Sequence, residues 1–79
     1  MQNEKRAKRE LFSELRKQKG TQAKVATENG ISEVYVRMIE NGTFTPGRDL
    51  MFRLSSYFNT DATKLFPDYF KKSLTKIDN

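Results

Sequence analysis

The reactive side chains of this 79-residue chain are carboxylates, hydroxyls, amides and the cations of Lys and Arg, because the sequence contains neither His nor Cys. It therefore lacks thiolate nucleophiles, imidazole general bases and the usual nitrogen and sulfur ligands of zinc. The chain is also too short for the deep substrate cavity that is usual in enzymes. An enzyme is the least expected class, and the sequence indicates no cofactor, metal or small-molecule ligand.

The chemistry that remains is recognition of charge. Fifteen Lys and Arg residues against ten Asp and Glu residues give a net charge of +5, which favours a polyanionic partner. Residues 1–19 hold seven of the cations and three of the acids, so this segment is either a solvated helix face or an arm that binds phosphates. The longest apolar run has three residues, far fewer than a membrane span needs. We expect a cytoplasmic protein without a membrane anchor.

The charged residues are expected to lie on helices, because in no segment do apolar and polar residues alternate cleanly enough to predict a strand. The apolar stripes, together with the residues that begin and end helices, predict a compact all-α domain of five helices. They are expected over residues 3–19, 22–29, 33–41, 50–58 and 62–66. The residues expected to begin them are Thr21, Ser32 and Asp61. The residues expected to end them are Gly20, Gly30, Gly42 and Pro67.

Residues 22–41 have the length of two helices joined by a short turn, with helix-capping and helix-ending residues at the expected places. Ala26 is small enough for two helix backbones to approach, and Gly30 supplies the positive φ that the turn needs. The residues expected to fill the junction beneath are Val25, Ile31, Val36 and Ile39. The opposite face of helix 33–41 then remains free to enter the major groove of DNA.

Several short elements fall in one register: Leu15-Arg16, Lys19-Gly20, Thr21-Gln22, Ala26, Gly30-Ile31-Ser32, Ile39-Glu40-Asn41-Gly42, Pro46 and Leu65-Phe66. With these elements, residues 15–66 resemble the Cro/lambda-repressor type of helix-turn-helix domain, found in the Xre-like regulators of bacteria and phages. The resemblance implies a lambda-repressor-like domain over residues 1–67 and a short C-terminal tail over residues 68–79. It also implies that helix 33–41 reads DNA.

The exposed side of this helix matches positions that the family turns toward DNA bases: Glu33, Val34, Arg37 and Met38. Glu33 can accept a hydrogen bond from a cytosine amino group, and Arg37 can fork onto guanine or hold a phosphate. Val34 and Met38 can contact thymine methyl groups. An exposed β-branched residue such as Val34 has little structural reason at a helix start. Glu33 also suits the helix dipole, and Met38 also suits partial burial.

Residues expected at the DNA backbone are Gln22, Tyr35, Asn41, Thr43, Thr45, Arg48 and Lys8. The family usually carries basic residues after the Glu-Asn-Gly element, whereas residues 43–45 are Thr-Phe-Thr here. Some phosphate contacts must then come from elsewhere, and the basic first segment is a candidate. The resemblance further implies a structural ion pair between Arg16 and Glu40, which would tie the first helix to the end of the third.

These features predict a sequence-specific transcriptional regulator, most simply a repressor, that binds double-stranded DNA of the nucleoid as a homodimer on an inverted repeat. The expected dimer contact is a set of apolar residues near the C-terminus: Phe66, Tyr69, Phe70, Leu74 and Ile77. Alternatively, the tail folds back and caps the core of the monomer. Two further functions stay open, namely a protein-interaction module such as an antirepressor or complex subunit, and a peripheral membrane binder through residues 1–19.

Overall fold

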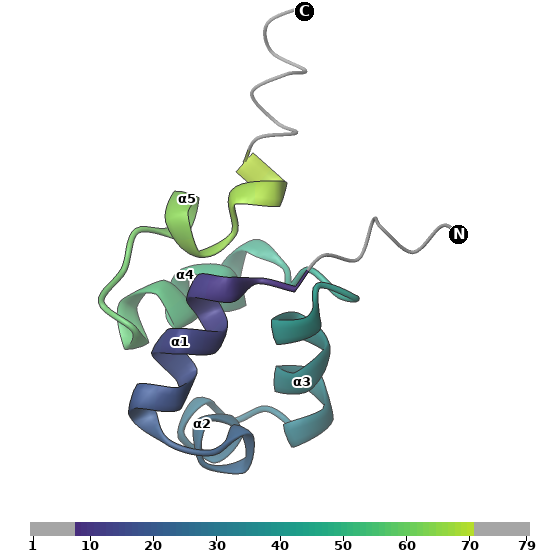
Figure 1. The fold of residues 1–79 in the computed structure, drawn as a ribbon, viewed down its shortest axis with the longest axis vertical. Helices are drawn as coiled ribbons and strands as arrows, with labels where there is room; N and C mark the ends of the chain where they lie inside the picture. Colours follow the sequence, from purple (N-terminus) through teal and green to yellow (C-terminus); the bar gives the residue numbers. More distant parts are fainter. Residues whose placement is uncertain (1–7, 71–79) are drawn as a thin grey trace, which may run out of the picture.

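Helices make up most of residues 8–70, the part of the chain that the computed structural model describes. They are α1 Glu10–Lys19, α2 Gln22–Asn29, α3 Glu33–Asn41, α4 Arg48–Tyr57 and α5 Ala62–Leu65 (Figure 1). Residues 67–70 add one more helical turn, and residues 8–70 contain no strand. The expected all-α helix-turn-helix architecture is confirmed. No helix in the described range is long and apolar enough to cross a membrane.

The ends of these helices are set by local side chains and glycines. The hydroxyls of Thr21 and Ser32 accept hydrogen bonds from the backbone three residues on, at 3.1 Å each, and so cap α2 and α3. The carboxylate of Asp61 caps α5 by accepting from the backbone N–H of Thr63, two residues on, at 3.4 Å. Gly30 ends α2 with φ at 68°, a left-handed conformation that a side chain would strain. These caps were predicted from sequence and are confirmed.

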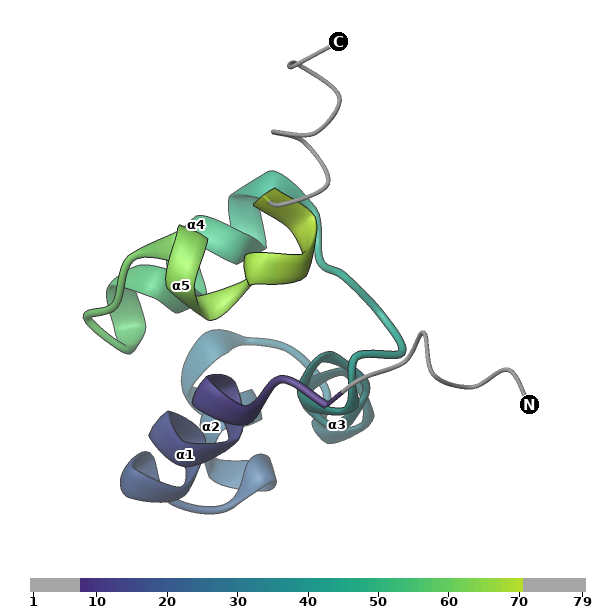
Figure 2. The same ribbon diagram turned by 45° about the horizontal axis from the view of Figure 1, so that its top comes forward.

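The helices form two groups around one core. Figure 2 shows α4, α5 and the turn after α5 on one side, and α1, α2 and α3 on the other. Within the second group α2 packs against α3, and α1 lies against both. The small side chain of Ala26 on α2 is buried. Large fully buried side chains fill the centre: Phe12, Val25, Val36, Ile39, Met51, Leu54, Leu65 and Phe66.

The first helix is shorter than its apolar stripe predicted. It begins at Glu10 rather than near residue 3, because Arg9 is extended and its backbone N–H donates to the Glu40 carbonyl at 2.9 Å. Leu11, expected on the inner stripe, is exposed. The expected start near residue 3 and Ala7 lie outside the described residues.

The fifth helix and the segment after it also differ from expectation. Helix α5 ends at Leu65, one residue earlier than predicted, and Phe66 before Pro67 is non-helical, as expected of a residue that precedes proline. Pro67 then begins a further helical turn, a first-turn position that suits proline. Phe66 was predicted to face a second copy, and this is wrong, because its side chain is fully buried in the core. Phe70 packs partly against that core, and Tyr69 is exposed. Leu74 and Ile77 lie outside the described residues.

Candidate nucleic-acid interface

Helix α3 has one buried and one exposed face. Val36 and Ile39 point inward and are fully buried. Glu33, Val34 and Arg37 lie on the outer face, all exposed. Val34, an apolar β-branched residue at the second position of α3, is 51% exposed. A single exposed apolar residue is ordinary on a protein surface, and Phe52 on α4 is exposed to the same extent. Val34 is distinguished by its place on the outer face of α3, beside Glu33 and Arg37.

Of the other predicted contact residues on α3, Tyr35 and Met38 are only partly exposed. Met38 lies at the edge of the buried face, so only part of its side chain could reach a base. The ring of Tyr35 packs on the ring of Phe44, with centroids 4.9 Å apart, and so joins α3 to the loop that follows it. Asn41 is exposed at the last position of α3.

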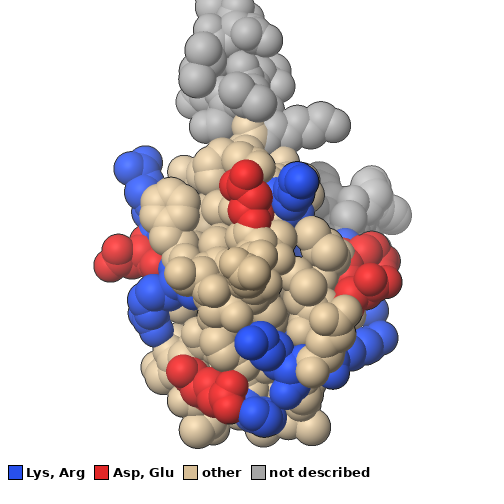
Figure 3. All heavy atoms as spheres, turned by 90° about the vertical axis from the view of Figure 1, so that its left-hand side faces the viewer, with Lys and Arg blue, Asp and Glu red and all other residues tan. Residues whose placement is uncertain are grey.

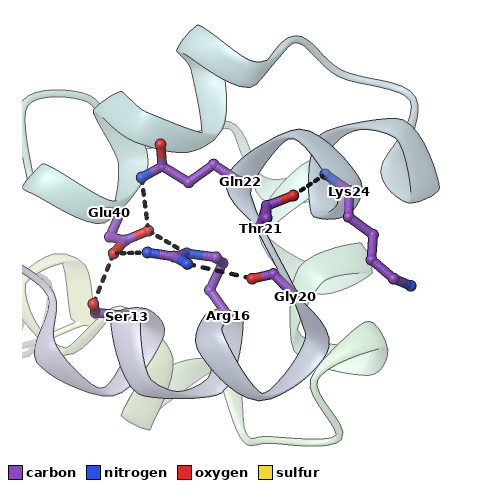
Figure 4. Close-up of polar contacts among 7 residues, drawn as sticks. All are labelled: Ser13, Arg16, Gly20, Thr21, Gln22, Lys24 and Glu40. Atoms are coloured by element: carbon purple, nitrogen blue, oxygen red, sulfur yellow. Dashed lines mark hydrogen bonds and ion pairs between the residues drawn. The ribbon is translucent and has the colours of Figure 1, made fainter.

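The end of α3 is tied to α1 and α2 through the carboxylate of Glu40. Arg16 donates from Nε and Nη2 to the two Glu40 oxygens at 2.9 Å each. Ser13 Oγ donates at 2.7 Å, and Gln22 Nε2 at 3.1 Å (Figure 4). The side chains of Arg16 and Glu40 are only 16% and 4% exposed. The ion pair implied by the resemblance is therefore present, and three helices meet at one buried charge.

Hydrogen bonding decides the charge state of Glu40. Burial alone would raise the pKa of this carboxyl group, but the hydrogen bonds from Arg16, Ser13 and Gln22 outweigh it and lower the pKa to about 2. The same contact raises the pKa of Arg16. Both groups are thus ionised near neutral pH, and the orientation of α3 relative to α1 depends on their charges.

Acid should therefore weaken the fold through Glu40. Folding lowers the pKa of this group from 4.5 to about 2, so its contribution is complete above about pH 5 and shrinks as the pH falls toward 2. The linkage amounts to about 3 kcal/mol. We expect Glu40→Gln to be less stable than the parent at pH 7, with the gap closing toward pH 2. Thermal melts across this range test it, with Glu14→Gln, an exposed acid on α1, as control. A gap that stays constant with pH would contradict the pairing.

Residues predicted at the DNA backbone fall into two groups. Thr43, Thr45 and Arg48 are exposed along the chain between α3 and the first turn of α4. Lys8 is exposed beside the end of α3, because the N–H of the next residue binds the Glu40 carbonyl. Gln22 differs, since the sequence indicated a phosphate contact and its amide is bonded to Glu40 in the structure.

Sequence reasoning missed two residues that support this surface. Ser13 is buried and bonds Glu40; its place three residues before Arg16 on the same helix face could have indicated a shared partner. Arg9 was counted with the basic arm, but its side chain is buried and bonded to the end of α3 and to the loop after it. No local pattern marks that role.

Within residues 8–70, the face turned away from α3 carries no continuous basic surface. In Figure 3 acidic and basic side chains lie around its margin, and its centre is largely uncharged. Lys24 and Glu28 on α2 pair with each other at 2.7 Å, and Glu28 also accepts from the Tyr57 hydroxyl at 2.6 Å. Such pairing neutralises charge that would otherwise attract a polyanion.

Comparison with known families agrees with this geometry. A family model described as helix-turn-helix matches residues 12–65, more than half of the 79 residues. The matched range runs from within α1 to the end of α5 and includes α2, the turn at Gly30 and α3. Neither the comparison with curated proteins nor the comparison with solved structures found a match. The chain belongs to the Cro/C1-type helix-turn-helix family of DNA-binding regulators.

Proposed function

We propose that this chain is a sequence-specific transcriptional repressor of bacterial, phage or mobile-element type, which inserts α3 into the major groove of double-stranded DNA. The observation that carries the proposal is the outer face of α3, where exposed Val34 stands between Glu33 and Arg37. This face combines an acceptor, an apolar contact and a forked donor, the three kinds of group that distinguish base pairs in the major groove.

Each base contact follows from the chemistry of its side chain. Glu33 accepts from a cytosine amino group, and Arg37 donates to guanine. Val34 packs on a thymine methyl group, with the exposed part of Met38 beside it. The buried charge network at Glu40 supports this role, because base readout requires a helix held in one orientation.

Phosphate contacts come from the residues that flank α3: Lys8, Gln22, Tyr35, Asn41, Thr43, Thr45 and Arg48. Gln22 keeps a second amide hydrogen beyond the one given to Glu40, and Thr45 keeps its hydroxyl hydrogen while its oxygen accepts from Arg9. These donors replace the basic residues that the family usually carries after α3.

We also propose a homodimer that acts in the cytoplasm, on nucleoid DNA. One recognition helix reads only a few base pairs, and a two-fold partner adds a second half-site roughly 34 Å away. The C-terminal segment from Tyr69 onward supplies the dimer contact, since Tyr69 is 38% exposed. Phe66 has no part in it. Expected further contacts, Leu74 and Ile77, lie in residues 71–79.

The test is enrichment of bound duplexes from a random DNA library, followed by titration of the recovered duplex at several salt concentrations. We expect an inverted repeat and a log affinity that falls linearly with log salt concentration, as counterions leave the phosphates. A protein-interaction module would yield no enriched sequence and a slope near zero on any duplex.

Variants on α3 separate base contacts from phosphate contacts. Val34→Ala and Arg37→Ala should each cost about 1 to 3 kcal/mol on the recovered duplex and far less on random DNA. Lys8→Ala should weaken both duplexes alike. Lys64→Ala, an exposed cation on α5, is the charge-matched control for Arg37. Equal losses on both duplexes would show that Val34 and Arg37 do not read bases.

A further inference from the structure

Arg9 lies inside the fold although it belongs to a strongly basic segment. Its side chain is only 3% exposed. We propose that Arg9 is a positioning residue for the DNA-binding surface, and that Asp68, in the helical turn of residues 67–70, holds it in place, so that this turn controls DNA affinity from a distance. The inference rests on the proposed function and adds to it a link between two parts of the chain.

Arg9 caps the end of the recognition helix. The last carbonyls of a helix have no partner within it, and two of those in α3 are bound by this one residue. Its backbone N–H donates to Glu40 O at 2.9 Å, and its Nη1 donates to Ile39 O at 2.6 Å. A cation at a helix C-terminus also interacts favourably with the helix dipole. The C-terminal end of α3 is therefore held by a residue that precedes α1.

The same guanidinium group holds the loop after α3. Its Nη1 donates to Phe44 O at 3.0 Å, and its Nη2 donates to Thr45 Oγ1 at 2.8 Å. From the other side, the Phe44 ring packs on Tyr35 of α3. The loop is thus fixed between Arg9 and α3. Its Thr43 and Thr45 are proposed phosphate contacts, so Arg9 sets their position without touching DNA.

Asp68 completes the site from the far end of the described chain. Arg9 donates to its two carboxylate oxygens from Nε at 3.1 Å and from Nη2 at 2.8 Å, a forked geometry that favours Arg over Lys. The guanidinium carbon also lies 5.2 Å from the centre of the Phe66 ring. Without Asp68, a buried cation would lose its counter-charge, and its hold on the loop would weaken.

Asp68 itself can be replaced without opening the core, because 56% of its side chain is exposed. This makes Asp68→Asn the decisive variant. It removes an acid and raises the net charge above +5, so general electrostatics would strengthen DNA binding. The positioning role requires the opposite result. Glu14→Gln on α1 makes the same change of charge at an exposed site and is the matched control.

The experiment measures duplex affinity and amide hydrogen exchange in the full chain, at a temperature where every variant is folded. For Asp68→Asn we expect about tenfold weaker binding, and faster exchange at the amides of Thr43 and Phe44, which both donate to Met38 O. Exchange at Thr60, which donates to Ser55 O, should not change. Asp68→Glu keeps the carboxylate and should restore most of the affinity.

Two results would overturn the inference. Binding by Asp68→Asn that equals or exceeds that of Glu14→Gln would show that Asp68 does not act on the DNA surface. Unchanged exchange at Thr43 and Phe44 would show that Arg9 does not depend on Asp68 to hold the loop. If the parent chain binds no duplex, the proposed function itself fails, and this outcome differs from both results above.

Discussion

Arg16→Ala should lower the free energy of unfolding by about 3 to 5 kcal/mol, because it leaves the Glu40 carboxylate buried without its counter-charge. Glu40 would keep hydrogen bonds from Ser13 and Gln22 but lose both bonds from Arg16. The variant also loses the bond from Arg16 Nη1 to Gly20 O at 3.3 Å, which braces the short turn between α1 and α2. Such a loss is large against the 5 to 15 kcal/mol that is typical of whole domains.

Urea denaturation of Arg16→Ala beside Lys17→Ala isolates the effect of the ion pair. Lys17 is exposed on the same helix, so its variant removes the same charge without stranding a partner and should change stability by less than about 0.5 kcal/mol. In a Glu40→Gln background, Arg16→Ala should cost far less than in the parent. If Arg16→Ala instead melts like the parent but no longer binds DNA, Arg16 acts on the DNA surface.

The features that sequence predicted well are those decided within one turn of helix. Thr21 and Ser32 lie only three residues before the amides they cap. Gly30 adopts a left-handed conformation because it has no side chain. The outer face of α3 follows in the same way, from the spacing of Val36 and Ile39 on its inner face. Local chemistry determines each of these features.

The features that sequence could not predict depend on partners distant along the chain. An apolar stripe extending to Ala7 favoured a longer α1, but the chain is extended at Arg9 because carbonyls at the end of α3 bind it. Its carboxylate partner, Asp68, is 59 positions away. Nothing in the sequence around Arg9 distinguishes it from neighbouring solvated cations, so its burial became evident only from the folded chain.

Phe66→Ala should be similarly destabilising, by about 3 to 5 kcal/mol. The Phe66 side chain is fully buried, and its ring lies 6.3 Å from that of Phe12, measured between centroids. Truncation removes these contacts and leaves a cavity that α1 and α5 cannot fill without moving. It also removes the ring beneath the Arg9 guanidinium group.

Tyr69→Ala is the matched control, since it removes an aromatic ring from the adjacent helical turn at an exposed position. We expect it to cost no more than about 1 kcal/mol of stability while weakening self-association, because Tyr69 belongs to the proposed dimer contact. Thermal unfolding and analytical sedimentation of both variants separate these two roles. If Phe66→Ala melts like the parent but sediments as a monomer, Phe66 belongs to an interface between two copies. The opposite pattern, a large loss of stability for Phe66→Ala and a loss of dimer for Tyr69→Ala, places the boundary between core and interface between Phe66 and Tyr69.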